Sequence, residues 1–187
     1  SAHYSFRKGN SSQKYPTSLM GSIALLKQTY LDADWYRQGV EDFNYSYEAF
    51  NRHQDLPQIF EITDAYDISR VFEIADEFEI DYILKGNGDE YKQIKNINET
   101  NFSFILPLSF PKSYDISNPE YSKNITLEQL KHWELAPFNP IILAQNSISF
   151  CFTSSDLKKR SDFLENLRKS VSHGLDKSLA LAALTTV

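Results

Sequence analysis

The side chains most able to do chemistry are few and widely spaced. The chain has four histidines, His3, His53, His132 and His173, and a single cysteine. None of them falls in a His-X-His, His-Glu-X-X-His or Cys-X-X-Cys spacing, the patterns that place two metal donors side by side. The sequence therefore predicts no zinc site built from its own histidines.

Three of these residues have ready structural interpretations. His132 and His173 fall in predicted helices, where a lone histidine more often packs or caps than binds a ligand. His173 directly precedes Gly174, a position that favours a cation at the negative end of a helix dipole. Cys151 lies in the apolar run 148–152, so an intrachain disulfide is excluded and a buried structural thiol is favoured.

Two further features stand at the ends of predicted strands. The turn Gly86-Asn87-Gly88 is only superficially like a phosphate-binding loop, because it lacks the third glycine and the lysine of such loops. Glu61 ends an apolar strand, and the ends of parallel strands are where barrel enzymes keep their chemistry. Its carboxylate is either functional or paired with Lys85 at the end of the next strand, and we favour the ion pair.

Composition narrows the class of protein. With 187 residues, 41% of them hydrophobic, the chain is long enough for one globular domain with a real core. The formal net charge of -6 and the lack of a long basic run argue against a nucleic-acid partner. Neither a signal-peptide pattern nor a membrane-spanning run is visible in this stretch, and the sequence predicts no compartment.

The elements that must position these residues follow an α/β rhythm. We expect residues 1–56 to form a helical lead-in, with a polar loop over 1–15 and helices over 19–36 and 45–50. Residues 57–187 read as βα units, and each strand-helix-strand stretch has the length of a parallel crossover. The predicted strands are 58–62, 82–84, 102–106 and 148–153; the predicted helices are 68–78, 89–94, 126–133, a short one from 139, 161–171 and 176–184. An irregular connection over 107–125, with Pro107, Pro111 and Pro119, separates the third strand from the next helix.

Three long, ordered segments carry a family resemblance: Tyr15–Tyr36, His132–Pro140 and Asp162–Lys169. They resemble segments of imidazolonepropionase-related amidohydrolases. The resemblance implies an α/β fold that is part of a (β/α)8 TIM barrel, with the four predicted strands corresponding to the fifth to eighth strands of a metal-dependent hydrolase. It also implies zinc or a similar divalent metal in active relatives.

The ligand positions that the resemblance implies are occupied by other residues here. Active members end the fifth and sixth strands in histidines and the eighth in an aspartate that binds metal. This chain has Glu61 at the first place, followed by Thr63, and Gly86 at the second. Ser155 stands at the third place, with Asp156 one residue late. Because glycine has no donor atom and a displaced side chain points elsewhere, we expect no metal in this chain.

Two hypotheses of function follow. The chain is either a catalytically degenerate amidohydrolase-like segment with a structural or ligand-binding role in a larger protein, or a piece of an active metal-dependent hydrolase of C–N bonds. About four strands leave two sheet edges unpaired, and we expect the inward face to carry Ile59, Ile83, Phe104 and Phe150. The partner is then the remainder of the parent barrel or a second copy, and a homodimer is favoured because one helix shields only one edge.

Overall fold

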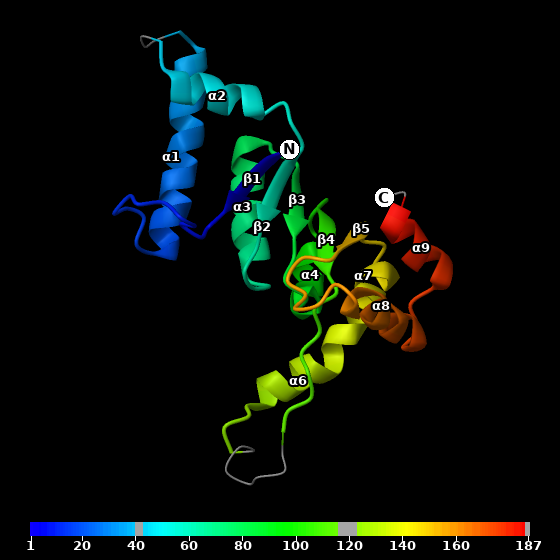
Figure 1. The fold of residues 1–187 in the computed structure, drawn as a ribbon. Helices are drawn as coiled ribbons and strands as arrows, with labels where there is room; N and C mark the ends of the chain where they lie inside the picture. Colours follow the sequence, from blue (N-terminus) through cyan, green and yellow to red (C-terminus); the bar gives the residue numbers. More distant parts are fainter. Residues whose placement is uncertain (40–42, 116–122, 186–187) are drawn as a thin grey trace.

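The computed structural model describes residues 1–39, 43–115 and 123–185, and its centre is a parallel β-sheet (Figure 1). Five strands lie side by side in the order in which they follow along the chain. Each strand pairs in parallel with the next. The strands are β1 (Ala2–Ser5), β2 (Gln58–Glu61), β3 (Tyr82–Lys85), β4 (Ser103–Pro107) and β5 (Phe150–Thr153). This is the α/β architecture of a partial TIM barrel.

Helices connect the strands, as the hydrophobic spacing predicted. Between β1 and β2 run α1 (Leu19–Arg37) and α2 (Tyr45–His53), and between β2 and β3 runs α3 (Asp67–Phe78). After β3 come the 3-10 turn η1 (Glu90–Gln93) and α4 (Ile94–Ile97); after β4 come α6 (Leu127–Leu135), η2 (Ala136–Phe138) and α7 (Asn139–Gln145). The chain closes with α8 (Asp162–Ser172) and α9 (Lys177–Thr185). Pro119 lies outside the described residues.

Local capping signals set several of these boundaries. The Ser18 side chain accepts a hydrogen bond from the backbone N–H of Gly21 and so begins α1. Thr126 and Gln129 form the predicted reciprocal capping box at the start of α6. Gly174, with φ +120, follows α8 in a conformation that a side chain would disfavour. These short-range signals explain why the predicted and observed helix ends agree.

The polar opening segment is a strand, so the prediction of a loop over 1–15 was wrong for β1. The ring of Tyr4 packs against Tyr30, Phe60 and Tyr82, with centroid separations of 6.2, 6.4 and 5.7 Å. Ala2 donates a backbone hydrogen bond to the carbonyl of Pro57, at the entrance to β2. Only alternate residues of this edge strand contact the core. A strand of four residues is too short for this two-residue alternation to be recognised in the sequence.

The two faces of the sheet differ in burial. Phe60, Leu84, Phe104 and Phe150 are paired across β2 to β5, and each is at most 3% exposed beneath the helices. Residues of the opposite face are only partly buried; they include Ile59, Glu61, Ile83, Lys85, Ser103, Ile105, Cys151 and Thr153. The expectation that Phe104 and Phe150 share a face with Ile59 and Ile83 was therefore wrong, because the register shifts them to the helix side.

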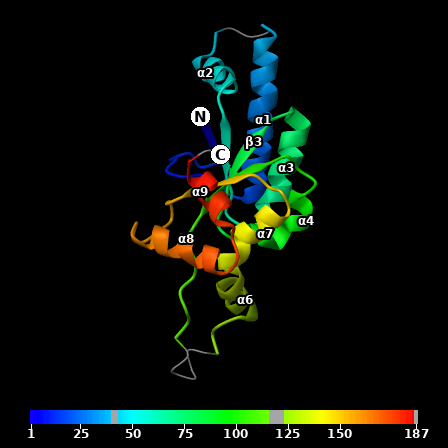
Figure 2. The same ribbon diagram turned by 90° about the vertical axis from the view of Figure 1, so that its right-hand side faces the viewer.

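The helices lie beside the sheet and beyond both ends of its strands (Figures 1 and 2). In Figure 1, α1 lies to the left of the sheet and continues above it, α2 lies above it, and α6 lies below it, beyond the carboxyl ends of the strands. Within the described ranges, none of the helices combines the length and apolarity needed to cross a membrane.

Candidate functional site

The site predicted from the sequence begins at the carboxyl end of β2, where Glu61 lies opposite Lys85 of β3. The Lys85 ammonium donates a hydrogen bond to Glu61 Oε1 over 3.1 Å. The expected ion pair is therefore confirmed. The ammonium occupies one of the two carboxylate oxygens. Glu61 is thus tied to its neighbour strand.

Thr63 anchors the turn into α3. Its backbone N–H and its hydroxyl both donate to Asp67 Oδ2, over 2.9 and 2.8 Å. The other carboxylate oxygen of Asp67 accepts from Arg70 over 2.8 Å. Asp67 is 1% exposed, so this short network is a buried connection between β2 and the first turn of α3. Thr63 therefore connects the end of β2 to α3 through Asp67.

At the end of β3, the carboxylate of Glu90 occupies the space beside Gly86. A Cβ atom added to Gly86 would lie 2.0 Å from Glu90 Oε1. That oxygen accepts hydrogen bonds from the backbone N–H groups of Asn87 and Gly88 over 2.7 and 3.0 Å. Glu90 Oε2 accepts from the Asn139 side chain over 2.5 Å. The place where the resemblance implies a histidine ligand is therefore filled by a different, fully buried acid.

Glu90 is the most perturbed carboxyl group of this region. Its side chain is 0% exposed, and burial raises its pKa above the ordinary 4.5, against the lowering effect of its hydrogen bonds. Asn139 also accepts from the backbone N–H of Tyr91 over 2.9 Å, so it links α7 to η1. Sequence reasoning identified Asn139 only as a helix start and missed Glu90. The one feature of the sequence that could have indicated Glu90 is the glycine at position 86, because glycine is favoured where another group approaches the backbone closely.

The third predicted position lies at the far edge of the sheet. Ser155 and Asp156 follow β5, which is separated from β2 by β3 and β4, or roughly 14 Å at normal strand spacing. Asp156 is exposed, has a φ of +65 and accepts a hydrogen bond from the hydroxyl of Ser155 over 3.3 Å. Its backbone carbonyl accepts from Ser109 over 3.1 Å. The structure brings Glu61 next to Lys85, but it does not bring Ser155 and Asp156 to them.

These positions do not fit a divalent metal. Glu61 is paired with a cation, Gly86 has no donor, and the space beside it is filled by Glu90, whose carboxylate accepts three hydrogen bonds. In the part of the chain that the structure describes, no three His, Cys, Asp or Glu side chains are grouped so that they could hold a metal ion.

The other singled-out residues lie outside this cluster. His132 of α6 stacks on Tyr91, and its Nδ1 lies 3.1 Å from the tyrosine hydroxyl; burial, followed by the charge of Lys92, lowers the pKa of this histidine. His173 Nδ1 lies 2.7 Å from the carbonyl of Lys169, so it caps α8. Cys151 is only half-buried on the open face of the sheet, which corrects the expectation of a core thiol, and burial raises its pKa.

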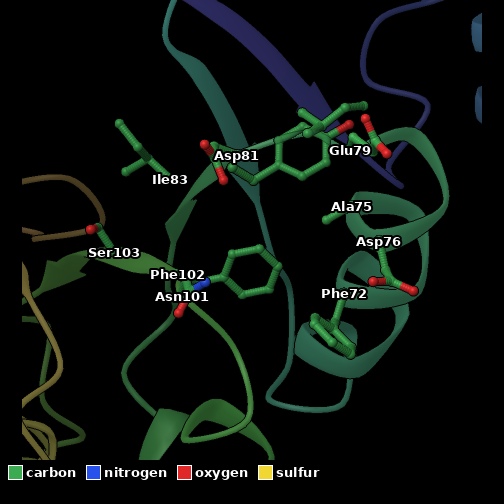
Figure 3. Close-up of a pocket in the computed structure, with 11 residues that line it drawn as sticks. Phe72, Ala75, Asp76, Glu79, Asp81, Ile83, Asn101, Phe102 and Ser103 are labelled. Atoms are coloured by element: carbon green, nitrogen blue, oxygen red, sulfur yellow. The ribbon is translucent and has the colours of Figure 1, made fainter.

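Two hollows lie at opposite ends of the strands. A groove of about 1170 Å³ at the carboxyl ends of β4 and β5 is bounded by the segments that follow them, by α8 and by Trp133 of α6. A hollow of about 670 Å³ lies at the amino ends of β3 and β4 (Figure 3). In Figure 3, Asp76 and Glu79 come from the α3 side, and Asp81 and Asn101 from the strand side. Barrel enzymes bind their ligands at the carboxyl ends, so the groove is the better placed of the two.

Comparison with known proteins gives one informative likeness. No family model and no curated protein matches the sequence. Among solved structures, the crystal structure of an amidohydrolase from Thermotoga maritima MSB8 superposes with a TM-score of 0.62 at 14% sequence identity. The match covers 91% of this chain and 44% of that chain, so this chain spans less than half of the amidohydrolase's length. The chain thus has the fold of part of an amidohydrolase barrel.

Proposed function

We propose that this chain is a catalytically degenerate segment of an amidohydrolase-like barrel, related to the imidazolonepropionase group, and that its role is structural or ligand-binding within a larger protein. The observation that carries the proposal is the filled site at the end of β3. Gly86 offers no metal donor, and Glu90 occupies the adjoining space with three hydrogen bonds. A histidine at position 86 would collide with that carboxylate, so a single substitution does not restore a ligand there.

The proposal includes a partner that completes the barrel. In the described residues five strands form the sheet, whereas a closed barrel of this class has eight. Three further strands are needed, and a second copy would bring five and raise the number to ten. The count therefore favours the remainder of a parent barrel, in the same or another polypeptide, over the homodimer expected from the two unpaired edges. The partly buried face of the sheet would then line the barrel interior.

Zinc binding tests the degenerate site. Purified chain is equilibrated with excess zinc chloride, dialysed and subjected to elemental analysis. We expect far less than one zinc per chain, and the Cys151→Ser variant identifies any zinc held by the thiol alone. Near-stoichiometric zinc that persists in this variant would contradict the proposal and favour a fragment of an active metal-dependent hydrolase acting on C–N bonds.

A further inference from the structure

The groove at the carboxyl ends of β4 and β5 has an unusual charge for this protein. Five basic and three acidic side chains line it, a local excess of two positive charges on a chain whose formal net charge is -6. The basic residues are Lys112, Lys158, Lys159, Arg168 and Lys169; the acidic residues are Asp156, Asp162 and Glu165. A positive groove on an acidic chain attracts anionic partners selectively.

These cations have little internal neutralisation. In the residues that the structure describes, none of the ion pairs involves Lys112, Lys158 or Arg168, and the same is true of the other two basic residues. Lys169 instead lies over the ring of Phe110, with its ammonium 5.9 Å from the centroid. The charges come from three segments: Lys112 from the chain after β4, Lys158 and Lys159 from the chain after β5, and the others from α8. They therefore surround the groove.

The groove also offers aromatic surface. Trp133 of α6 lines it and is 39% exposed, and Phe110 lines it from the segment after β4. Its volume of about 1170 Å³ exceeds the upper end, about 1,000 Å³, of the range typical of small-molecule pockets. Cations beside the exposed Trp133 and the partly buried Phe110 suit an extended ligand that alternates carboxylates with apolar groups.

We propose that this groove binds an acidic peptide segment, with the carboxylates of the peptide on Lys158, Lys159 and Arg168 and an apolar side chain on Trp133. The inference goes beyond the proposed barrel role and is independent of it, because every residue it uses lies outside the cluster around Glu61 and Gly86.

Trp133 provides the measurement. The chain has two tryptophans, so the Trp35→Phe variant leaves Trp133 as the sole indole reporter. The probe is a synthetic heptapeptide of alternating glutamate and leucine, and the comparison peptide has glutamine in place of each glutamate. We expect a saturable change in Trp133 emission with the acidic peptide, an affinity at least about tenfold weaker for the neutral one, and weaker binding at higher salt.

Charge reversal locates the binding site. In the same background, Lys158→Glu/Lys159→Glu should weaken binding of the acidic peptide at least about tenfold. The control Lys8→Glu/Lys95→Glu changes the net charge equally at exposed positions away from the groove and should leave affinity within about twofold. If the first variant does not fold, Lys158→Gln/Lys159→Gln should still lower affinity and flatten its salt dependence.

Several outcomes would overturn the proposal. They are the absence of a saturable change with the acidic peptide, equal affinity for the glutamine peptide, or equal weakening by the control pair. Tighter binding of a short oligothymidylate than of the peptide would also overturn it, because the groove would then be a general polyanion site.

Discussion

Gly86 and Glu90 are the residues on which the proposal of a degenerate site depends. The glycine leaves room for a buried carboxylate that holds two backbone N–H groups and the Asn139 side chain. A carboxylate so enclosed is costly unless all its hydrogen bonds are kept, and any group added at position 86 would break this arrangement. The pair therefore acts as a unit, and it excludes the ligand that the family resemblance implies at this place.

Gly86→Ala should destabilise the chain by about 2 kcal/mol, because the new methyl group must displace the Glu90 carboxylate from its buried hydrogen bonds. Urea denaturation followed by circular dichroism measures the change. In a Glu90→Ala background the same substitution should cost much less, since the colliding group is gone. Equal costs in both backgrounds would show that Glu90 does not determine the need for glycine at 86.

Glu90 should also give the chain a distinctive pH dependence. Burial raises its folded pKa above the ordinary 4.5, so its protonated form is favoured by folding. That contribution to stability is complete below the unfolded pKa and is lost as the pH rises through the folded pKa. Relative to Glu90→Gln, the wild-type free energy of unfolding should therefore fall as the pH rises above about 4.5. A difference that is constant or grows with pH would contradict this assignment.

Among single residues, the sequence predicted contacts between partly exposed side chains better than contacts between buried ones. The Glu61–Lys85 pair was predictable because both residues end neighbouring parallel strands, which puts them in register. The Glu90–Asn139 contact joins residues far apart in sequence. No local pattern indicates that an acid will be buried there, because its hydrogen-bonding partners come from tertiary packing.

At the scale of elements, α6 is fixed to the body of the molecule through η1. His132 stacks on Tyr91, with its Nδ1 3.1 Å from the tyrosine hydroxyl, and Lys92 forms ion pairs with both Asp89 and Glu128. The capping box that starts α6 was visible in the sequence, because its two members are three residues apart. Its attachment to η1 was not, because the contact connects distant segments.

Acidification should loosen α6. Burial and the nearby Lys92 charge lower the folded pKa of His132 below its ordinary 6.5. The contribution of neutral His132 is therefore complete above pH 6.5 and is lost as the pH falls through the folded pKa. Hydrogen exchange, corrected for intrinsic rates, should show the α6 amides less protected at about pH 5.5 than at about pH 7.5, relative to those of α3. His132→Gln should remove this difference; an unchanged difference would assign it to another group.

Strand β1 shows where element prediction fails. Strands β2 to β5 are recognisable as short apolar runs because neighbouring strands and helices bury them. In β1, His3 and Ser5 are exposed while Tyr4 packs against the core, so half of the strand looks like loop. Its identity depends on pairing with β2, and this partner lies more than fifty residues away. The missed strand raises the number of strands in the sheet from the predicted four to five.

At the scale of the whole molecule, the open face of the sheet is the feature that most needs a partner. Ile59, Ile83 and Ile105 lie on this face only partly buried, and the edges of β1 and β5 are not paired with another strand in the described residues. Rows of free backbone groups and partly exposed isoleucine side chains promote association. The Glu61–Lys85 pair places some charge on the face, but both members are largely neutralised by each other.

The isolated chain should therefore self-associate in a concentration-dependent way and bind a hydrophobic dye. Replacing isoleucines of the open face as Ile83→Thr/Ile105→Thr keeps β-branched residues in the strands and should reduce both effects. The matched control is Leu164→Gln on α8, where the leucine is 54% exposed but lies off this face, and it should leave both unchanged.

Sedimentation velocity over a range of micromolar concentrations measures the mass. A monomer at every concentration with no dye binding would show that the face is not adhesive, whereas a discrete dimer abolished by the double substitution would favour a homodimer. Because two copies bring ten strands to a barrel of eight, we expect open-ended association of the chain alone, ended only by a segment that supplies the three strands that are lacking.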